Sequence, residues 1–284
     1  MPSADDILPD PGLLARMQVN APERVAQTSI AQVWKVRQYD GTPAALKIYE
    51  NGLRNEACAA DYLSQINGQG AVSVLSVRDN AVLLEWLEGP TLGDLSRAGE
   101  DERACAELVD VATRLHGQTV RDRGYPRIQD WLQAVLDLRC SADVSSEVQR
   151  DVVRCQALAR DLVNTPQDQR VLHGDLHHDN VMQTARGPVA FDPKGVVGEA
   201  AYELANAFRH PRGKFDVASD PRRIERFATQ VAEGLSVDRH RLLTWIPVKI
   251  ALSISWRCGG VLKADPETEL LAVALETRDR SLNG

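Results

Sequence analysis

The hydrophobic pattern of this 284-residue chain changes character about one third of the way along. Before residue 88, the apolar residues fall in short runs rich in β-forming residues and separated by turn signals such as Asp40-Gly41 and Asp79-Asn80. This pattern is typical of strands. One longer segment between the third and fourth runs has helical spacing. The predicted strands are Arg24–Thr28, Ala31–Arg37, Pro43–Tyr49, Ala71–Val77 and Val82–Trp86, and the predicted helix is Glu56–Ile66.

After Glu88-Gly89-Pro90, apolar residues recur mainly at helical spacing. Two short apolar runs, Arg170–Leu172 and Val189–Phe191, are exceptions, and we expect them to be strands on either side of a histidine-rich loop. The predicted helices are Asp101–Leu115, Ile128–Leu138, Val144–Leu162, Glu199–Phe208, Pro221–Leu235, Arg239–Cys258 and Glu267–Arg278. The sequence therefore predicts an α+β, two-lobed fold. A small β-rich lobe spans residues 1–87, and a larger helical lobe spans 88–284, with the ligand cleft expected between them.

The composition and net charge of the chain limit the classes of molecule that it is expected to bind. The chain is 43% hydrophobic and 26% charged, which is typical of a soluble globular protein. Its formal net charge of -7 disfavours nucleic-acid binding and suits a cationic small molecule. No apolar run is long enough for a membrane span, and the amino-terminal residues lack the features of a signal peptide. The five cysteines are scattered, so we expect a cytoplasmic protein without disulfides. We also expect a monomer or a homodimer.

The segment His173-Gly174-Asp175-Leu176-His177-His178-Asp179-Asn180 contains the residues best suited to catalysis. Asp175 and Asn180 lie on the loop between the two predicted strands, and Asp192 ends the second of them. Phosphoryl transfer from ATP needs a carboxylate that deprotonates the acceptor hydroxyl, together with oxygen ligands for Mg²⁺. We therefore predict Asp175 as the catalytic base and Asn180 and Asp192 as the magnesium ligands.

Two features of the small lobe support nucleotide binding. Lys47 lies within an apolar strand, where a buried ammonium group requires an anionic partner. The phosphates of ATP and the carboxylate of Glu56, at the start of the next helix, would supply one. The last strand runs into the connector before residue 88, where we expect backbone groups at Glu85 and Leu87 to bind adenine.

Together these residues resemble the protein-kinase-like fold, and specifically the aminoglycoside phosphotransferase superfamily. His173-Gly174-Asp175 stands where protein kinases have H-R-D, and Asp192-Pro193-Lys194-Gly195 where they have D-F-G. From about residue 24 to 275 the chain is similar to the streptomycin 6-phosphotransferase and hydroxyurea-resistance kinase family. The resemblance implies an ATP-dependent kinase that phosphorylates a hydroxyl of a cationic aminocyclitol antibiotic. Streptomycin 6-kinase is the leading expectation.

The resemblance also bears on residues outside the catalytic segment. No G-x-G-x-x-G motif precedes Lys47, so we expect the loop containing Thr28 and Ser29 to bind phosphates through small side chains and backbone N–H groups. Glu203 resembles the acidic residue that braces the catalytic loop in this superfamily. Candidate substrate contacts, each with packing or helix-end stabilisation as the alternative, are His178, Glu199 and Trp256.

Other functions stay open at this point. A kinase of another small alcohol or hydroxamate-like compound, such as hydroxyurea, a sugar or an amino alcohol, would use the same catalytic residues. A nucleotide-binding pseudokinase would lack the base or the metal ligands, which this chain has. A metallohydrolase centred on His173, His177 and His178 would bind a transition metal.

Overall fold

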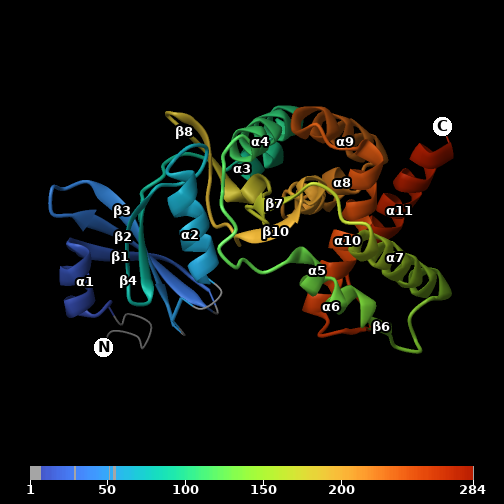
Figure 1. Cartoon of the computed structure of the whole chain (residues 1–284), viewed down its shortest axis with the longest axis horizontal. Coiled ribbons are helices and arrows are strands. Elements are labelled where there is room, and N and C mark those ends of the chain that lie inside the picture. The colour runs from blue at the N-terminus through green and yellow to red at the C-terminus, as the bar shows by residue number, and fades with distance from the viewer. Residues whose placement is uncertain (1–7, 29, 51, 54–55, 284) are drawn as a thin grey trace.

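The computed structural model describes residues 8–28, 30–50, 52–53 and 56–283 and has two lobes, in agreement with the predicted α+β fold (Figure 1). The small lobe is a five-stranded antiparallel sheet with strand order β1-β2-β3-β5-β4. Its elements are α1 (Pro11–Met17), β1 (Val19–Gln27), β2 (Ala31–Gln38), β3 (Pro43–Tyr49), α2 (Glu56–Ile66), β4 (Val74–Arg78) and β5 (Ala81–Glu85). The short helix α1 was not predicted; it starts at a proline that follows the capping residue Asp10.

The large lobe is mainly helical. Its helices are α3 (Leu92–Arg97), α4 (Asp101–His116), α5 (Ile128–Trp131), α6 (Gln133–Leu136), α7 (Ser146–Asn164), α8 (Phe215–Ala218), α9 (Pro221–Leu235), α10 (Arg239–Arg257) and α11 (Thr268–Asn283). Short 3₁₀ helices are η1 (His178–Asn180), η2 (Ala200–Tyr202) and η3 (Ala205–Arg209). Three two-stranded ladders, β7–β10, β6–β11 and β8–β9, contain β6 (Arg139–Cys140), β7 (Gln169–Leu172), β8 (Val181–Thr184), β9 (Gly187–Ala190), β10 (Val196–Glu199) and β11 (Val261–Leu262).

Two predicted helices differ from the structure. The segment Glu199–Phe208 is not one helix, because residues up to Glu199 form β10, which pairs with β7, and the rest forms η2 and η3. The segment Ile128–Leu138 divides into α5 and α6 at Leu132. Helix α3 was missed because it has only six residues, although Thr91 and Asp94 form a capping box at its start.

The main hydrophobic core lies in the large lobe and includes buried residues of α4, α7, α9 and α10. Helix α2 joins this core through Tyr62, Leu63 and Ile66, so it packs between the sheet and the large lobe (Figure 1). Helix α10 is buried along nearly its whole length, which explains its apolar sequence. No helix in the described part of the chain is long and apolar enough to cross a membrane.

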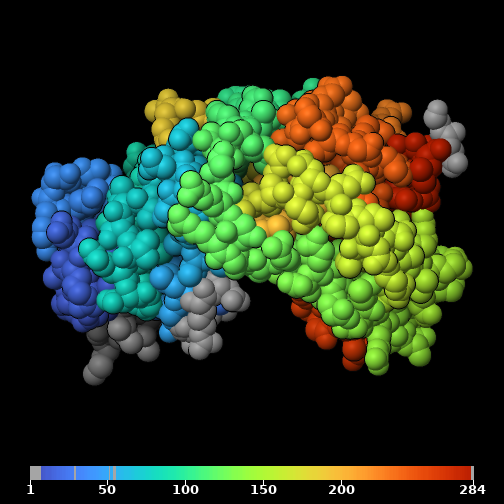
Figure 2. All heavy atoms as spheres, in the orientation of Figure 1, coloured from blue at the N-terminus to red at the C-terminus, as the bar shows by residue number. Residues whose placement is uncertain are grey.

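Several contacts join the lobes where the active site is expected. The backbone of Ala190 in β9 exchanges hydrogen bonds with Gly70 and Val72, at 2.9 and 2.8 Å. The loop between α4 and α5, green in Figure 2, crosses the junction beside α2, and its Tyr125 hydroxyl donates to the Asp61 carboxylate of α2. A Cβ atom at Gly195 would lie 2.6 Å from a backbone oxygen of α2, so only glycine fits this approach. These contacts hold the end of β9 against the small lobe.

Candidate active site

An ion pair also joins the two lobes just after the end of β9. Lys47 of β3 donates a hydrogen bond from Nζ to Oδ1 of Asp192 at 2.6 Å. Burial alone would lower the pKa of Lys47, but the Asp192 carboxylate more than offsets this and raises the pKa above its ordinary value. Asp192 has a left-handed backbone conformation, with φ of 58°, which turns the chain sharply at this point. The ammonium and the carboxylate therefore form a partly buried pair between the lobes.

The loop between β7 and β8 carries Asp175 in a braced conformation. The backbone N–H groups of His173 and Gly174 donate to the two carboxylate oxygens of Glu203, at 3.0 and 2.9 Å. Glu203 thus holds the loop, which is the role predicted for it. Asn206 of η3 donates to Oδ1 of Asp175 at 2.8 Å, so the orientation of this carboxylate is set from a second element.

Asn180 is fastened to both of the other predicted catalytic segments. Its side-chain Nδ2 donates to the backbone oxygen of Asp175 at 3.0 Å. Its own backbone oxygen accepts from the N–H of Phe191, the residue before Asp192, at 2.9 Å. The structure thus gathers Asp175, Asn180 and Asp192 into one centre although 17 positions separate the first from the last.

The donor atoms left over at this centre fit a hard cation. Because Nδ2 of Asn180 is used by the loop, its amide oxygen is available, and Lys47 occupies only Oδ1 of Asp192. One amide oxygen and one carboxylate oxygen match the few protein ligands that Mg²⁺ takes when it also binds phosphates and water. Asn180 and Asp192 are therefore the residues that would hold the ion.

The side chains of the other predicted nucleotide contacts in the small lobe differ in their surroundings. Lys47 pairs with Asp192 and not directly with Glu56, whose carboxylate raises the pKa of Lys47 only as a further charge after Asp192. The Thr28 hydroxyl accepts from the N–H groups of Ile30 and Ala31, closing the β1–β2 turn. Ser29 lies outside the described residues.

Of the two predicted connector residues, Glu85 uses its side chain within the protein, and Leu87 has backbone groups that are available. The Glu85 carboxylate accepts from the backbone N–H of Ser73 and pairs with Arg186, so its side chain is used within the protein. Within the described part of the chain, the backbone of Leu87 makes no hydrogen bond to another backbone group. Leu87 can therefore present its peptide groups to a ligand, as a connector that binds adenine requires.

Comparison with known proteins decides the family to which this centre belongs. The family model described as aminoglycoside/hydroxyurea antibiotic resistance kinase matches residues 16–259. The chain is 33% identical over 244 residues to the streptomycin 3''-kinase of Klebsiella pneumoniae, covering 82% of this chain and 86% of that protein. It is 30% identical over 249 residues to the streptomycin 6-kinase of Streptomyces griseus, covering 84% and 79%.

The chain belongs to the aminoglycoside/hydroxyurea antibiotic resistance kinase family. It is therefore a phosphotransferase, as its catalytic segment predicted. Among solved structures, choline kinase LicA from Streptococcus pneumoniae superimposes with a TM-score of 0.64 at 12% identity, covering 95% of this chain and 96% of that one. That likeness confirms the protein-kinase-like fold.

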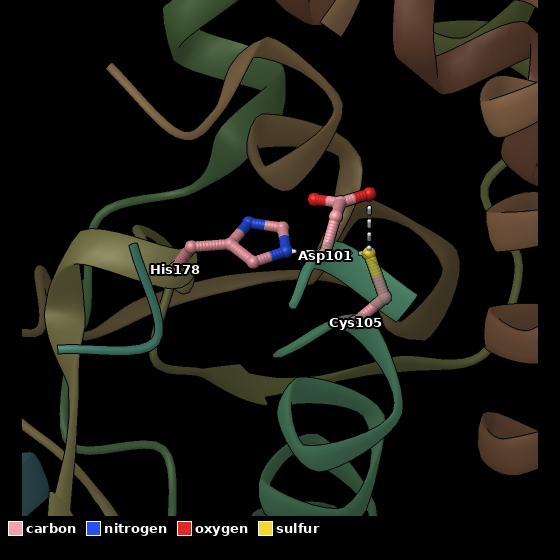
Figure 3. Close-up of side chains that lie close together, drawn as sticks. All are labelled: Asp101, Cys105 and His178. Carbon is pink, nitrogen blue, oxygen red and sulfur yellow. Dashed lines mark hydrogen bonds between the residues drawn. The ribbon is translucent and has the colours of Figure 1, made fainter. Parts of the chain in front are cut away.

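His178 does not have the position predicted for a substrate contact in this kinase. Its side chain is fully buried, and its Nε2 lies 3.4 Å from the Cys105 sulfur of α4 (Figure 3). Its ring also packs against Phe227 of α9. Burial lowers the pKa of His178 and so keeps it neutral. The alternative interpretation, that His178 packs the catalytic loop onto the large lobe, agrees with the structure.

The group formed by His178, Cys105 and Asp101 is close enough to hold a metal ion, but its charges argue against one (Figure 3). The Arg223 guanidinium donates to both carboxylate oxygens of Asp101, at 2.6 and 3.0 Å, and lies 3.6 Å from the Cys105 sulfur. Burial raises the pKa of Cys105 to about 12, whereas a metal-binding cysteine must ionise. A fixed cation already occupies the place that a metal ion would need.

The other histidines of the loop are also used internally. The His177 ring stacks on His210, with centroids 3.7 Å apart, and His173 shares a hydrogen bond with the backbone oxygen of Phe191. His173, His177 and His178 therefore contact three different parts of the lobe. The metallohydrolase alternative requires them to converge on one ion, so the structure does not support it.

Glu199 is likewise committed to packing. Its side chain is 2% exposed, and its carboxylate pairs with Arg241 and accepts hydrogen bonds from Trp245 Nε1 at 2.7 Å and the backbone of Gln167 at 3.1 Å. With four donors on two oxygens, this carboxylate is saturated. The predicted substrate contact does not fit this buried position.

Trp256 is the predicted substrate residue whose position fits a ligand. Its side chain is half exposed at the end of α10, and its ring packs edge-on against Trp131, with centroids 5.6 Å apart. The ammonium group of Lys249 lies 5.0 Å from the centre of the Trp256 ring. Helix α10 also packs against η3, whose Asn206 donates to Asp175, so the aromatic pair lies on the catalytic side of the lobe.

Sequence reasoning missed two residues of this kinase centre, Asn206 and Lys249. Asn206 lies in a buried 3₁₀ turn, and no short motif distinguishes it from a packing residue. Lys249 did carry a signal, because it interrupts the apolar run Ile246–Trp256. The rule applied to Lys47, that a lysine among apolar residues needs an anionic partner, applies to Lys249 as well.

Proposed function

We propose that this chain transfers the γ-phosphoryl group of ATP to a hydroxyl group of an aminoglycoside antibiotic, with streptomycin as the acceptor. The observation that carries the proposal is one arrangement of residues. Asp175, oriented by Asn206, lies in the same centre as Asn180 and the Lys47–Asp192 pair. A base, oxygen ligands for a cation and a phosphate-binding lysine are the parts that phosphoryl transfer requires.

In the proposed reaction, Asp175 accepts the proton of the acceptor hydroxyl. The acceptor oxygen forms its bond to the γ-phosphorus as the bond to the β–γ bridging oxygen breaks, and that electron pair leaves on ADP. Asn206 keeps the Asp175 carboxylate directed at the acceptor through its 2.8 Å hydrogen bond. Asn180 and Asp192 would hold Mg²⁺, which would supply positive charge to the phosphate oxygens when bound.

The small lobe, residues 1–87, is proposed to hold the nucleotide, and the large lobe, residues 88–284, the acceptor. Lys47 contacts the α- and β-phosphates, and the backbone groups at Glu85 and Leu87 bind adenine. The β1–β2 turn at Thr28 covers the phosphates. Trp256, which is half exposed, and Trp131, which packs against it, line the acceptor side.

The choice of acceptor rests on the relatives. Two of them are named streptomycin kinases, but the names give two different positions, 3'' and 6. The sequence had favoured the 6-position, whereas the relative with 33% identity is the 3''-kinase. The acidic net charge of -7 suits a cationic antibiotic.

The test is a panel assay with the purified protein, ATP and MgCl₂. ADP release is measured with streptomycin, other aminoglycosides, hydroxyurea, choline and simple sugars, and the phosphate on any product is located by ³¹P and ¹H NMR. We expect streptomycin to stimulate ADP release and to carry the phosphate at one hydroxyl. Stimulation by hydroxyurea or a simple alcohol alone would refute the proposed acceptor. Asp175→Asn in the same assay tells enzymatic turnover from contaminating ATPase.

A further inference from the structure

Lys249 is a buried charged residue for which the proposed mechanism has no role. It lies on the buried helix α10, and only 4% of the residue is exposed. An ammonium group has three hydrogen-bond donors, and burying it without a partner is costly. Among the described residues, none accepts a hydrogen bond from this ammonium or forms an ion pair with it. The group is therefore a cation without a partner in the free protein.

The surroundings of the Lys249 ammonium place it at the catalytic centre. Asp175 and Glu267 favour its charged form, whereas Arg209 and Lys194 oppose it. Its remaining neighbour is the ring of Trp256, 5.0 Å away. Helix α10, which contains Lys249, packs against η3, and Asn206 of η3 donates to the proposed base Asp175, so Lys249 lies near the catalytic centre.

Neither carboxylate near Lys249 forms an ion pair or a hydrogen bond with its ammonium in the described part of the chain. Glu267 accepts two hydrogen bonds from the Arg209 guanidinium, at 2.7 and 2.8 Å, and pairs with Arg257 at 2.9 Å. Asp175 accepts from Asn206. The charge of Glu267 is thus already balanced, and the ammonium stays unpaired beside a carboxylate that has its own donor.

Lys194 adds to the positive charge at this place. It belongs to the segment that begins with Asp192, and within the described residues its ammonium has no hydrogen bond or ion pair either. Lys47, by contrast, is neutralised by Asp192. Two ammonium groups without a described acceptor therefore lie near Asp175, where they can attract an anionic group.

We propose that the Lys249 ammonium binds the γ-phosphoryl group of ATP and stabilises its oxygens while the group is transferred. This inference rests on the proposed kinase reaction. In the transfer, the hydroxyl proton goes to Asp175 and the bridging oxygen leaves on ADP with its electron pair. Lys249 keeps its proton and donates hydrogen bonds to the oxygens that the γ-phosphorus retains, where negative charge is concentrated.

The first test compares two nucleotides and needs no acceptor. The affinities for AMP-PNP and for ADP are measured by calorimetry in MgCl₂, because ADP lacks the γ-phosphoryl group. We expect Lys249→Met to lower the preference for AMP-PNP over ADP about tenfold, and Lys249→Arg to keep most of it. Lys263→Met, which removes an exposed lysine of the same lobe, leaves the preference unchanged. An unchanged preference in Lys249→Met overturns the proposal.

The second test uses any acceptor that the wild-type protein phosphorylates. We expect Lys249→Met to reduce kcat about 100-fold and to change the acceptor KM by less than about threefold. A raised acceptor KM at unchanged kcat would assign Lys249 to acceptor binding instead. If the wild type phosphorylates no aminoglycoside, the proposed acceptor is wrong, while the nucleotide comparison still decides the role of Lys249.

Thermal unfolding tests the unpaired state itself. Burial lowers the pKa of Lys249 to about 8, with Asp175 acting in the opposite direction. Below pH 8 the folded protein holds a buried charge that the unfolded chain solvates, so Lys249→Met should raise Tm by about 2–4 °C at pH 7. Above pH 8 the wild-type ammonium loses its proton, and the difference should shrink. A lower Tm for Lys249→Met at pH 7 would contradict the absence of a partner.

Discussion

Asp175 and Asp179 lie on the same loop, four positions apart, and their surroundings differ in kind. Asp179 accepts hydrogen bonds from Arg97 at 2.7 Å, from His210 at 2.9 Å and from the backbone N–H of Arg212 at 3.2 Å. Asp175 accepts one from Asn206, and a quarter of its side chain is exposed. One carboxylate is saturated by protein donors, and the other has free capacity.

This difference distinguishes Asp179, a structural carboxylate, from Asp175, the proposed catalytic carboxylate. Burial alone would raise the pKa of Asp179, but the hydrogen bonds from His210 and Arg97 hold that pKa well below its usual range. Such a group cannot take up a proton near neutral pH. Its function is to tie the loop to α3 and to the segment after η3, so that Asp175 has a fixed position.

The largest expected effect comes from changing the chemical carboxylate. Asp175→Asn should reduce acceptor phosphorylation about 10²- to 10⁴-fold, because the amide cannot accept the hydroxyl proton. Tm should change little, since the side chain is partly exposed and makes few contacts. ADP release and thermal unfolding are the measurements, with the exposed Asp216→Asn as the control. Near-normal turnover in Asp175→Asn would refute the assigned base.

Changing the structural carboxylate should act on stability first. Asp179→Ala removes the acceptor of the His210 ring and one of the acceptors of the Arg97 guanidinium, at a cost of about 2–3 kcal/mol. Tm should fall by several degrees, measured by calorimetry. Asp94→Ala provides the matched control, because Asp94 binds the same Arg97 from an exposed position and should cost less. Equal losses in the two variants would contradict the anchoring role.

The same carboxylate predicts an acid-sensitive component of stability. Because the folded-state pKa of Asp179 is depressed, its contribution is complete above the ordinary value of 3.8 and is lost as the pH falls toward the depressed value. The stability difference between wild type and Asp179→Ala should therefore shrink below about pH 4. Denaturant titrations at pH 7, 5 and 3.5 measure it. A pH-independent difference would show that the pKa of Asp179 is not depressed.

A third, smaller effect should come from the single donor to Asp175. Asn206→Asp keeps an oxygen for Arg209, which donates to Asn206 at 2.7 Å, but removes the donor to Asp175. We expect kcat to fall about tenfold, because the base loses its orientation, with the KM for ATP unchanged. Asn206→Ala should lose a similar factor in kcat. Unaltered kcat in both variants would reduce Asn206 to a packing residue.

The smallest effect is expected at the rim of the cleft. Trp256→Ala should raise the acceptor KM about three- to tenfold and leave kcat nearly unchanged, because the exposed ring contributes uniform binding. Phe215→Ala removes another exposed aromatic ring of the same lobe and should have no effect. An unchanged acceptor KM in Trp256→Ala would exclude this tryptophan from the acceptor site.

Local patterns determined much of the fold. The strands and α2 of the small lobe, and α4, α7, α9 and α10 of the large lobe, follow from apolar spacing and turn signals. The helix predicted over Glu199–Phe208 failed because strand pairing with β7 and the ion pair with Arg241 outweigh helical propensity there. Such long-range partners leave no periodic signal in the segment itself.

The residues of the candidate site also include some that local sequence patterns identified and some that they did not. Asp175, Asn180, Asp192 and Lys47 were recognisable because phosphoryl transfer needs those residue types at those places along the chain. His178 and Glu199 were misjudged, since a polar residue beside a catalytic motif can face either the cleft or the interior. Their burial is a property of the packed lobe.

The sequence by itself determined which side chains are available for chemistry and the order in which they occur. Only the tertiary structure decided which of them are already satisfied. Asp179 is saturated and Asp175 is not, although they share one loop. Lys47 has a carboxylate partner, whereas Lys249 has none among the described residues, although both lysines interrupt apolar segments. The physical reason is that the partners come from distant elements, so whether a buried charge is paired depends on the complete packing of the two lobes.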